Sequence, residues 1–230
     1  MSESEHKVVS REEWDSLRAD LLKKEKHLTK LSDTLASERQ SLPWVKITKS
    51  YTFQTPSGPQ SLLDLFNGKS QLFIYHFMLG PGWKAGCPSC SFWADNFAGM
   101  AYHLPHRDVA FTMISRAPLS EIETYKKRMN WEYNWVSSAG SEFNFDMKVS
   151  EVAKEKGESE REHPERGDEE KPGISVFVRR GDDVFLSYCT TARGLEGINA
   201  VYGALDMVPK GRDERSLPWP MAWVKRHDEY

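Results

Sequence analysis

Residues 72–90 read LFIYHFMLGPGWKAGCPSC and combine an apolar run, a turn rich in glycine and proline, and two closely spaced cysteines. An apolar run of this length, bounded by turn residues, predicts a β-strand that is buried on both faces, as in a parallel sheet. Cys87 and Cys90 then follow in the order Cys-Pro-Ser-Cys. The sequence therefore places two thiols in the turn that leaves a core strand.

The segments after this turn continue an alternation of helices and strands. Apolar residues recur with helical spacing from Trp93 to Leu104, and residues 109–114 predict a second buried strand. Further along we expect a helix over 118–129, an edge strand over 135–138, a hairpin of 174–179 with 184–189, and a helix around 195–205. Such alternation predicts the α/β class, with a central sheet flanked by helices.

Three segments lie outside this α/β pattern. Residues 1–42 form an N-terminal helical extension, in which an apolar stripe over 10–40 predicts one long helix. The main domain, 43–212, contains a highly charged insert at 148–171 that cannot bury much surface. Residues 213–230 form a tail rich in aromatic residues. The apolar stripe of the helix either packs against its own domain or pairs with a second copy as a coiled coil. The aromatic tail covers either its own domain or a partner subunit. A homodimer formed through one of these segments is therefore one expectation.

Composition narrows the class of protein. The chain has 230 residues, 39% of them hydrophobic, and a net charge of −3, which gives no reason to expect nucleic acid or an anionic membrane as a partner. No apolar run approaches the roughly 18 residues of a membrane-spanning helix. Three cysteines are too few for a disulfide-stapled secreted scaffold. We therefore expect a cytoplasmic protein whose thiols rest in the reduced form.

The Cys-Pro-Ser-Cys motif suits thiol chemistry if it opens a helix. Cys87 would then occupy the N-cap, where unpaired N–H groups and the helix dipole favour a thiolate; in such motifs the thiol pKa falls from about 8.5 to ~3.5–7.5. Pro88 suits the first turn because it has no N–H to lose, and Ser89 completes the motif. Cys90 would lie one turn deeper. Cys87 is therefore the candidate nucleophile and Cys90 the candidate resolving thiol.

Residues before the motif are candidate active-site neighbours. The charge of Lys84 would favour a thiolate at Cys87, and Trp83 would form an apolar lip beside the thiol; ordinary surface and packing roles explain both equally well. Gly86 belongs to a turn whose glycines and proline indicate an exposed, shaped loop. That composition favours an active site over the alternative of two merely buried cysteines.

Two other kinds of site are compatible with the cysteines. His103 and His106 follow at a distance that resembles a zinc finger, but only two residues separate them, whereas fingers have three to five. We therefore expect no metal ligand and no cofactor. A peroxide reductase would need a proline and an arginine near one thiolate, and Pro81 and Arg116 are the candidates. Arg116 is equally a loop arginine in a salt bridge.

Two further residues, which lie in predicted strands, are expected to have structural roles only. Cys189 lies in an alternating strand and is expected to be a small packing residue. His76 interrupts the apolar run of the first core strand, where we expect a hydrogen-bonded core histidine.

Several segments resemble a thioredoxin-like family known as domain of unknown function 899. The resemblance covers about residues 8–212 and is carried by segments 8–14, 42–45, 76–83, 86–95, 115–119 and 135–138. It implies a thioredoxin-like α/β fold with an N-terminal helical extension, and a dithiol–disulfide oxidoreductase activity without a known substrate. The sequence departs from thioredoxins in one respect. Their cis-proline before the facing strand has no match, since Pro172 lies about two residues early and Gly173 or Ile174 takes its place.

These observations support three hypotheses. The first is a thiol–disulfide oxidoreductase that acts on a disulfide-containing protein or a small-molecule thiol or disulfide. The second is a peroxide reductase resembling peroxiredoxins. The third is a non-catalytic interaction module whose Cys-x-x-Cys pair is vestigial or binds zinc. The missing cis-proline casts doubt on protein substrates held by backbone pairing and leaves room for small molecules.

Overall fold

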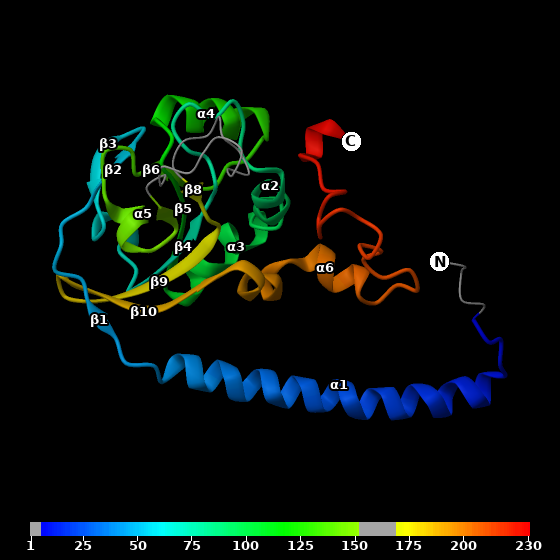
Figure 1. Ribbon diagram of the computed structural model, residues 1–230. Helices are drawn as coiled ribbons and strands as arrows, with labels where there is room; N and C mark the ends of the chain where they lie inside the picture. The colour runs from blue at the N-terminus through cyan, green and yellow to red at the C-terminus, as the bar shows by residue number, and fades with distance from the viewer. Residues whose placement is uncertain (1–5, 152–168) are drawn as a thin grey trace. The chain divides into compact units, whose positions relative to one another are not determined.

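The computed structural model describes residues 6–151 and 169–230 (Figure 1). The chain divides into two compact units, Met1–Pro43 and Trp44–Tyr230. The smaller unit contains α1 (Arg11–Gln40), which begins at Ser10, whose Oγ accepts a hydrogen bond from the Glu13 N–H. This confirms the predicted long helix. Across the described ranges, no helix has both the length and the apolar character needed to cross a bilayer.

One mixed sheet of eight strands forms the centre of the larger unit, in the order β1-β10-β9-β4-β5-β6-β2-β3. Strands β4, β5 and β6 are parallel, whereas β9 is antiparallel to β4 and β10 is antiparallel to β9. Their bounds are β1 (Val45–Lys46), β2 (Thr52–Thr55), β3 (Gly58–Ser61), β4 (Gln71–His76), β5 (Val109–Ser115), β6 (Trp135–Ser137), β9 (Gly173–Arg180) and β10 (Asp183–Thr191). The order β10-β9-β4-β5, with the cysteine turn after β4, is thioredoxin-like and confirms the expected fold class.

The central strand β4 is buried on both faces, as its apolar run predicts. Side chains alternate across a strand, so Leu72 and Ile74 enter one hydrophobic cluster while Tyr75 enters the other. The Tyr75 cluster includes side chains of α2 (Pro88–Ala94) and α4 (Leu119–Arg128). The opposite cluster includes those of η1 (Asp64–Phe66) and α5 (Phe143–Asp146). Helices on both faces therefore exclude water from the sheet.

Three predicted elements differ from the structure. The helix expected after the cysteines is two helices, α2 and α3 (Ala98–His103), because the Asn96 side chain donates to the Phe92 carbonyl and ends the first. A short 3-10 turn, η2 (Leu104–Arg107), follows. Likewise, η5 (Ala192–Ile198) precedes α6 (Ala200–Leu205), with Asn199 as the N-cap between them. Strand β6 is no edge strand, because β2 pairs with its other side.

The charged insert is only partly described. Its ends form a small two-stranded sheet, β7 (Ser150–Glu151) with β8 (Glu169–Glu170). The expectation of a loop or solvated helix falls on residues 152–168, which lie outside the described part of the chain. The tail ends in a 3-10 turn, η6 (His227–Glu229), and belongs to the larger unit.

Candidate functional site

The loop between β4 and α2 is held against the end of β5 and the segment that follows it. The Phe77 N–H donates to the Ile114 carbonyl (2.9 Å), and the Ala117 N–H donates to the Leu79 carbonyl (2.9 Å). The Cys87 N–H then donates back to the Met78 carbonyl (3.1 Å). The end of the loop is therefore bonded to its own beginning, two residues after β4, and this fixes the position at which α2 begins.

The two cysteines of the motif lie together at the start of α2. Cys87 is the N-cap residue and is partly buried, whereas Cys90 is buried with 1% of its surface exposed. No disulfide joins them, and the Cys87 side chain lies next to that of Cys90. Burial, and then the neighbouring Cys87, raises the pKa of Cys90 well above its usual value. One thiol is therefore accessible and the other is kept protonated behind it.

Tyr75 lies beneath the buried thiol. It is fully buried on β4, and its hydroxyl makes no hydrogen bond of good geometry with the described residues. Burial raises its pKa well above the usual value, and the neighbouring Cys90 raises it further. A protonated tyrosine beside Cys90 is a hydrogen-bond donor for any thiolate that forms there. Nothing in the residue spacing singled out this tyrosine.

Gly86 is packed so tightly that no side chain fits there. A Cβ at this position would lie 2.5 Å from the Phe77 ring and 2.8 Å from the Tyr125 ring. Its carbonyl accepts two hydrogen bonds from Arg226, one from Nε (3.0 Å) and one from Nη2 (2.7 Å). The Arg226 side chain is 16% exposed. A residue from the far end of the chain thus holds the peptide group that precedes Cys87.

We expect Gly86→Ala to destabilise the larger unit by about 1–3 kcal/mol, because both rings are buried and cannot move aside without cost. The measurement is the free energy of unfolding by denaturant titration. Gly99→Ala is the matched control, since Gly99 lies within α3 and has no atom within 4 Å of the added methyl. A helix interior favours alanine, so the control should be neutral or stabilising. Equal stability of both variants would contradict the packing argument.

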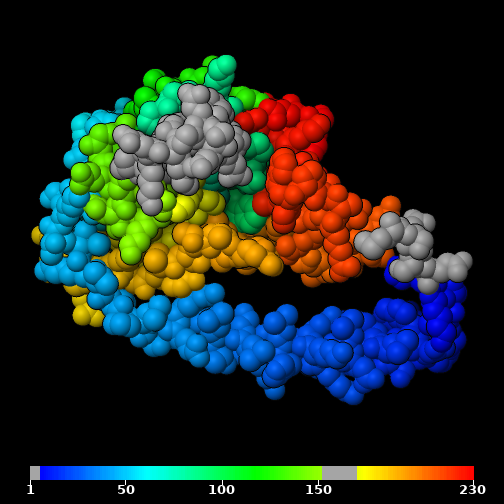
Figure 2. Space-filling model, in the orientation of Figure 1, coloured from blue at the N-terminus to red at the C-terminus, as the bar shows by residue number. Residues whose placement is uncertain are grey.

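The C-terminal tail packs on α2, the helix that carries the cysteines (Figure 2). The Trp223 ring meets Phe92 of α2 edge to face, with 5.5 Å between centroids. At the end of α2, Asp95 accepts hydrogen bonds from Trp131 Nε1 (2.9 Å) and pairs with His227 Nδ1 (2.7 Å). The tail therefore folds back on its own domain, one of the two predicted arrangements. Its aromatic composition indicated this, but its target could not be read from the sequence.

The predicted neighbours of Cys87 occupy different surroundings. Trp83 is buried, and Lys84 is exposed; both line a shallow pocket of about 290 Å³ against α4. Pro88 and Ser89 occupy the first turn of α2 and are half-buried. Arg116 pairs with the buried carboxylate of Glu170 through Nη1 (2.9 Å), and its guanidinium lies over the Phe145 ring.

The remaining candidate residues are also located. His103 and His106 are exposed at the end of α3 and in η2, and no group of three potential metal ligands occurs among the described residues. The expectation for Cys189 is wrong, since this thiol is exposed on β10, which β1 covers only at Phe185 and Leu186. His76 is a core histidine, as expected, with Nε2 2.8 Å from Ser175 Oγ.

The structure also shows which residues stand where thioredoxins have their cis-proline. No cis peptide bond occurs within residues 6–151 and 169–230. Gly173 pairs with His76 and Ile174 with Tyr75 in the ladder between β9 and β4. Pro172 precedes this ladder and lines a pocket that also contains Cys90.

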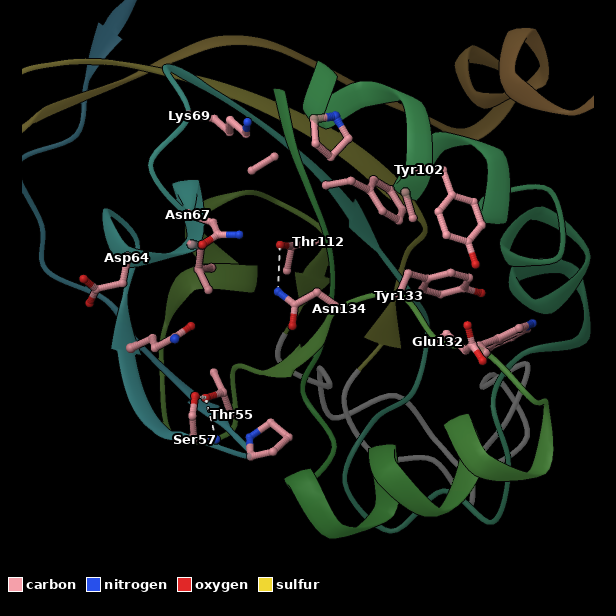
Figure 3. Close-up of a pocket in the computed structure, with 18 of the residues that line it drawn as sticks. Thr55, Ser57, Asp64, Asn67, Lys69, Tyr102, Thr112, Glu132, Tyr133 and Asn134 are labelled. Carbon is pink, nitrogen blue, oxygen red and sulfur yellow. Dashed lines mark hydrogen bonds between the residues drawn. The ribbon is translucent and has the colours of Figure 1, made fainter. Parts of the chain in front are cut away.

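A third and larger pocket, of about 840 Å³, lies elsewhere (Figure 3). It lies between the β2–β3 hairpin and the segment before β6, and many of its side chains are polar, among them Thr55, Asp64 and Glu132. Within its lining, Asn134 Nδ2 donates to Thr112 Oγ1 (3.0 Å), as Figure 3 shows. None of its lining residues is a cysteine.

Comparison with known proteins places the chain in a family. The fold is similar to that of peroxidoxin BcpB from Mycobacterium tuberculosis, with 13% identity, 70% of this chain and 97% of that chain covered, and a TM-score of 0.48. It is also similar to apo Sco1 protein from Thermus thermophilus, with 15% identity, 71% and 92% covered, and a TM-score of 0.41. No curated protein matches the sequence. A family model matches residues 3–230, and the chain therefore belongs to the family described as bacterial protein of unknown function, DUF899.

Proposed function

We propose that the protein is a thiol–disulfide oxidoreductase, with Cys87 as the nucleophile and Cys90 as the resolving thiol. One observation carries this proposal: a partly accessible thiol at the start of α2 lies next to a buried thiol one turn deeper. Two such sulfurs can form a disulfide with little movement of the helix. A pair that only filled the core would not leave one thiol partly exposed.

The two thiols suit two successive steps. The Cys87 thiolate attacks one sulfur of the substrate disulfide, forms a mixed disulfide and releases the other half as a thiolate. Cys90 then loses its proton and attacks the Cys87 sulfur, which closes the Cys87–Cys90 disulfide and releases the second half. The substrate gains two electrons and, after protonation, becomes two thiols, while the enzyme loses two electrons. An external dithiol restores the enzyme by the reverse exchange.

The raised pKa of Cys90 gives this order a physical reason. A thiol that stays protonated at neutral pH is a poor first attacker, because the thiolate is the nucleophile. Once Cys87 carries a substrate half, Cys90 needs to form a thiolate only briefly, and the amide N–H of Met78 favours that charge. Tyr75 lies in position to donate a hydrogen bond to it.

The proposal is tested by redox titration of the purified full-length protein. In glutathione buffers, the Cys87–Cys90 disulfide should form reversibly, with a potential between about −270 and −120 mV. Mass spectrometry after alkylation reads the two thiols separately. Consumption of peroxide without turnover of any disulfide would instead support the peroxide-reductase alternative. A pair that never forms a disulfide would leave the non-catalytic module as the remaining hypothesis.

A further inference from the structure

A pocket of about 450 Å³ lies directly beside the buried thiol. One wall is formed by Cys90 and Tyr75 of the core, and another by residues of the C-terminal tail, including Glu214 and Met221. A volume of this size holds a small organic molecule, since ligand pockets measure roughly 300–1,000 Å³. The pocket thus brings an open cavity against one sulfur of the proposed redox pair, that of Cys90.

The interior of this pocket is aromatic and apolar. Trp93 and Tyr202 meet edge to face within the lining, with 5.7 Å between ring centroids. Met78 and Leu195 add flexible aliphatic and thioether surface. The buried Tyr75 hydroxyl, which makes no hydrogen bond of good geometry with the described residues, supplies one polar point. Such a wall favours a flat apolar group with at most one hydrogen-bond acceptor.

The four charged side chains in the lining are already engaged with other protein groups. Arg193 pairs with Glu196 (2.7 Å), and Arg212 pairs with both Glu196 (3.2 Å) and Asp206 (2.7 Å). The lining therefore neutralises its own charges. An ionic ligand would have to compete with these pairs, whereas an uncharged ligand would not.

The fourth charge, Glu214, is hydrogen-bonded to neutral groups of the protein. Its Oε1 accepts hydrogen bonds from Tyr202 Oη (2.8 Å), Trp223 Nε1 (2.7 Å) and the Met221 N–H (3.0 Å). These bonds tie the tail to the wall of the pocket. The pocket is thus a built cavity, closed on one side by the tail, and its polarity is low.

We propose that this pocket binds a small, uncharged, largely apolar disulfide and is the substrate site of the redox pair. This inference rests on the proposed function. One half of the substrate occupies the pocket beside Cys90 while its sulfur is exposed to Cys87. The Cys87 thiolate attacks the sulfur of the bound half, which breaks the substrate disulfide and releases the other half as a thiolate. The bound half, now joined to Cys87, remains beside Cys90, which loses its proton, attacks the Cys87 sulfur and releases that half as a second thiolate. Protonation yields a neutral thiol, which leaves the pocket.

The test compares two aromatic disulfide reagents that differ in charge. Dithiodipyridine is uncharged, and dithiobis(nitrobenzoate) is dianionic; both release a coloured thiolate or thione. Each rate is divided by the rate with free glutathione, which corrects for intrinsic reactivity. All proteins carry Cys189→Ser, because Cys189 is exposed and would react as well. We expect the corrected rate of the uncharged reagent to exceed that of the anion at least tenfold and to saturate with concentration.

A substitution that fills the pocket should remove this preference. Met78 is partly buried in the lining, and Met78→Trp places a larger side chain in the cavity while keeping the backbone groups that bond the cysteines. The ratio of the two corrected rates should fall to about one. Met147→Trp is the matched control, since Met147 is also a partly buried methionine but lies outside the pocket. Equal ratios in both variants, or no preference in the parent, would overturn the proposal.

A binding measurement separates this inference from the redox function. In full-length protein with Cys87, Cys90 and Cys189 all replaced by serine, equilibrium dialysis should show saturable binding of dithiodipyridine. Adding Met78→Trp should weaken this binding at least tenfold. Binding with no reversible Cys87–Cys90 disulfide in the parent would mean that the pocket exists but the redox function fails. A reversible disulfide without saturable binding would overturn the pocket proposal alone.

Discussion

Cys87→Ser is expected to reduce disulfide turnover to the background rate. The serine hydroxyl keeps the size and position of the thiol but is not ionised at neutral pH, so the first attack on the substrate disulfide is lost. Cys90 does not replace it, because burial keeps that thiol protonated. The measurement is the rate of insulin or glutathione-linked disulfide reduction with an external dithiol present.

Cys90→Ser replaces a thiol by a hydroxyl, as Cys87→Ser does, but we expect a different result. Cys87 still captures one half of the substrate, but nothing resolves the mixed disulfide, which should accumulate and be visible as an added mass. Cys189→Ser is the matched control, since that thiol is exposed on β10 and takes no part in the proposed chemistry. It should turn over at the parent rate. Full activity of Cys87→Ser would contradict the oxidoreductase proposal. In cell extract, the mixed disulfide that accumulates on Cys90→Ser would identify the substrate.

Acid should destabilise the protein through His76 before its carboxylates protonate. Burial lowers the pKa of His76 to about 3, whereas an unfolded histidine has a pKa near 6.5. Between these values the unfolded chain binds a proton that the folded protein does not. The contribution is therefore fully present above about pH 6.5 and is lost as the pH falls toward about 3, at about 1.4 kcal/mol per pH unit. Between about pH 6.5 and 4.5 the loss should reach about 2 kcal/mol.

The surroundings of His76 explain why its charge is so unfavourable. Nε2 lies 2.8 Å from Ser175 Oγ, Nδ1 has no hydrogen-bond partner in the described structure, and the ring stacks on Phe143. No described carboxylate bonds to this ring to stabilise a positive charge. The measurement is denaturant unfolding across this pH range.

A double variant isolates the contribution of this histidine. His76→Leu with Ser175→Ala removes the titrating group and its polar partner together, so neither is left buried alone. The slope of stability against pH between about 6.5 and 4.5 should then flatten. His106→Leu is the control, because His106 is exposed and its loss should leave the slope unchanged. An unchanged slope in the double variant would show that other groups cause the acid sensitivity.

Local patterns were sufficient to predict the core of the fold. The uninterrupted apolar run at 72–79 predicted a strand buried on both faces, and β4 is that strand. Helical spacing predicted α1 and α4, and the turn at 180–183 predicted the β9–β10 hairpin. These signals work because they depend on neighbours within one turn or one strand. The position of Cys87 as the N-cap of α2 was predictable for the same reason.

Tertiary structure decided what surrounds the two thiols. Residues far apart in the sequence meet there: Tyr75 beneath Cys90, Arg226 on the Gly86 carbonyl, and Glu214 in the pocket wall. Periodicity does not encode such contacts, because they depend on how the sheet and the tail close in space. The sequence by itself determined that two thiols lie at the start of a helix, since that is a local arrangement. Only the packing of distant segments decided which of the two thiols is buried and what cavity lies beside it, because burial and cavities belong to the folded whole.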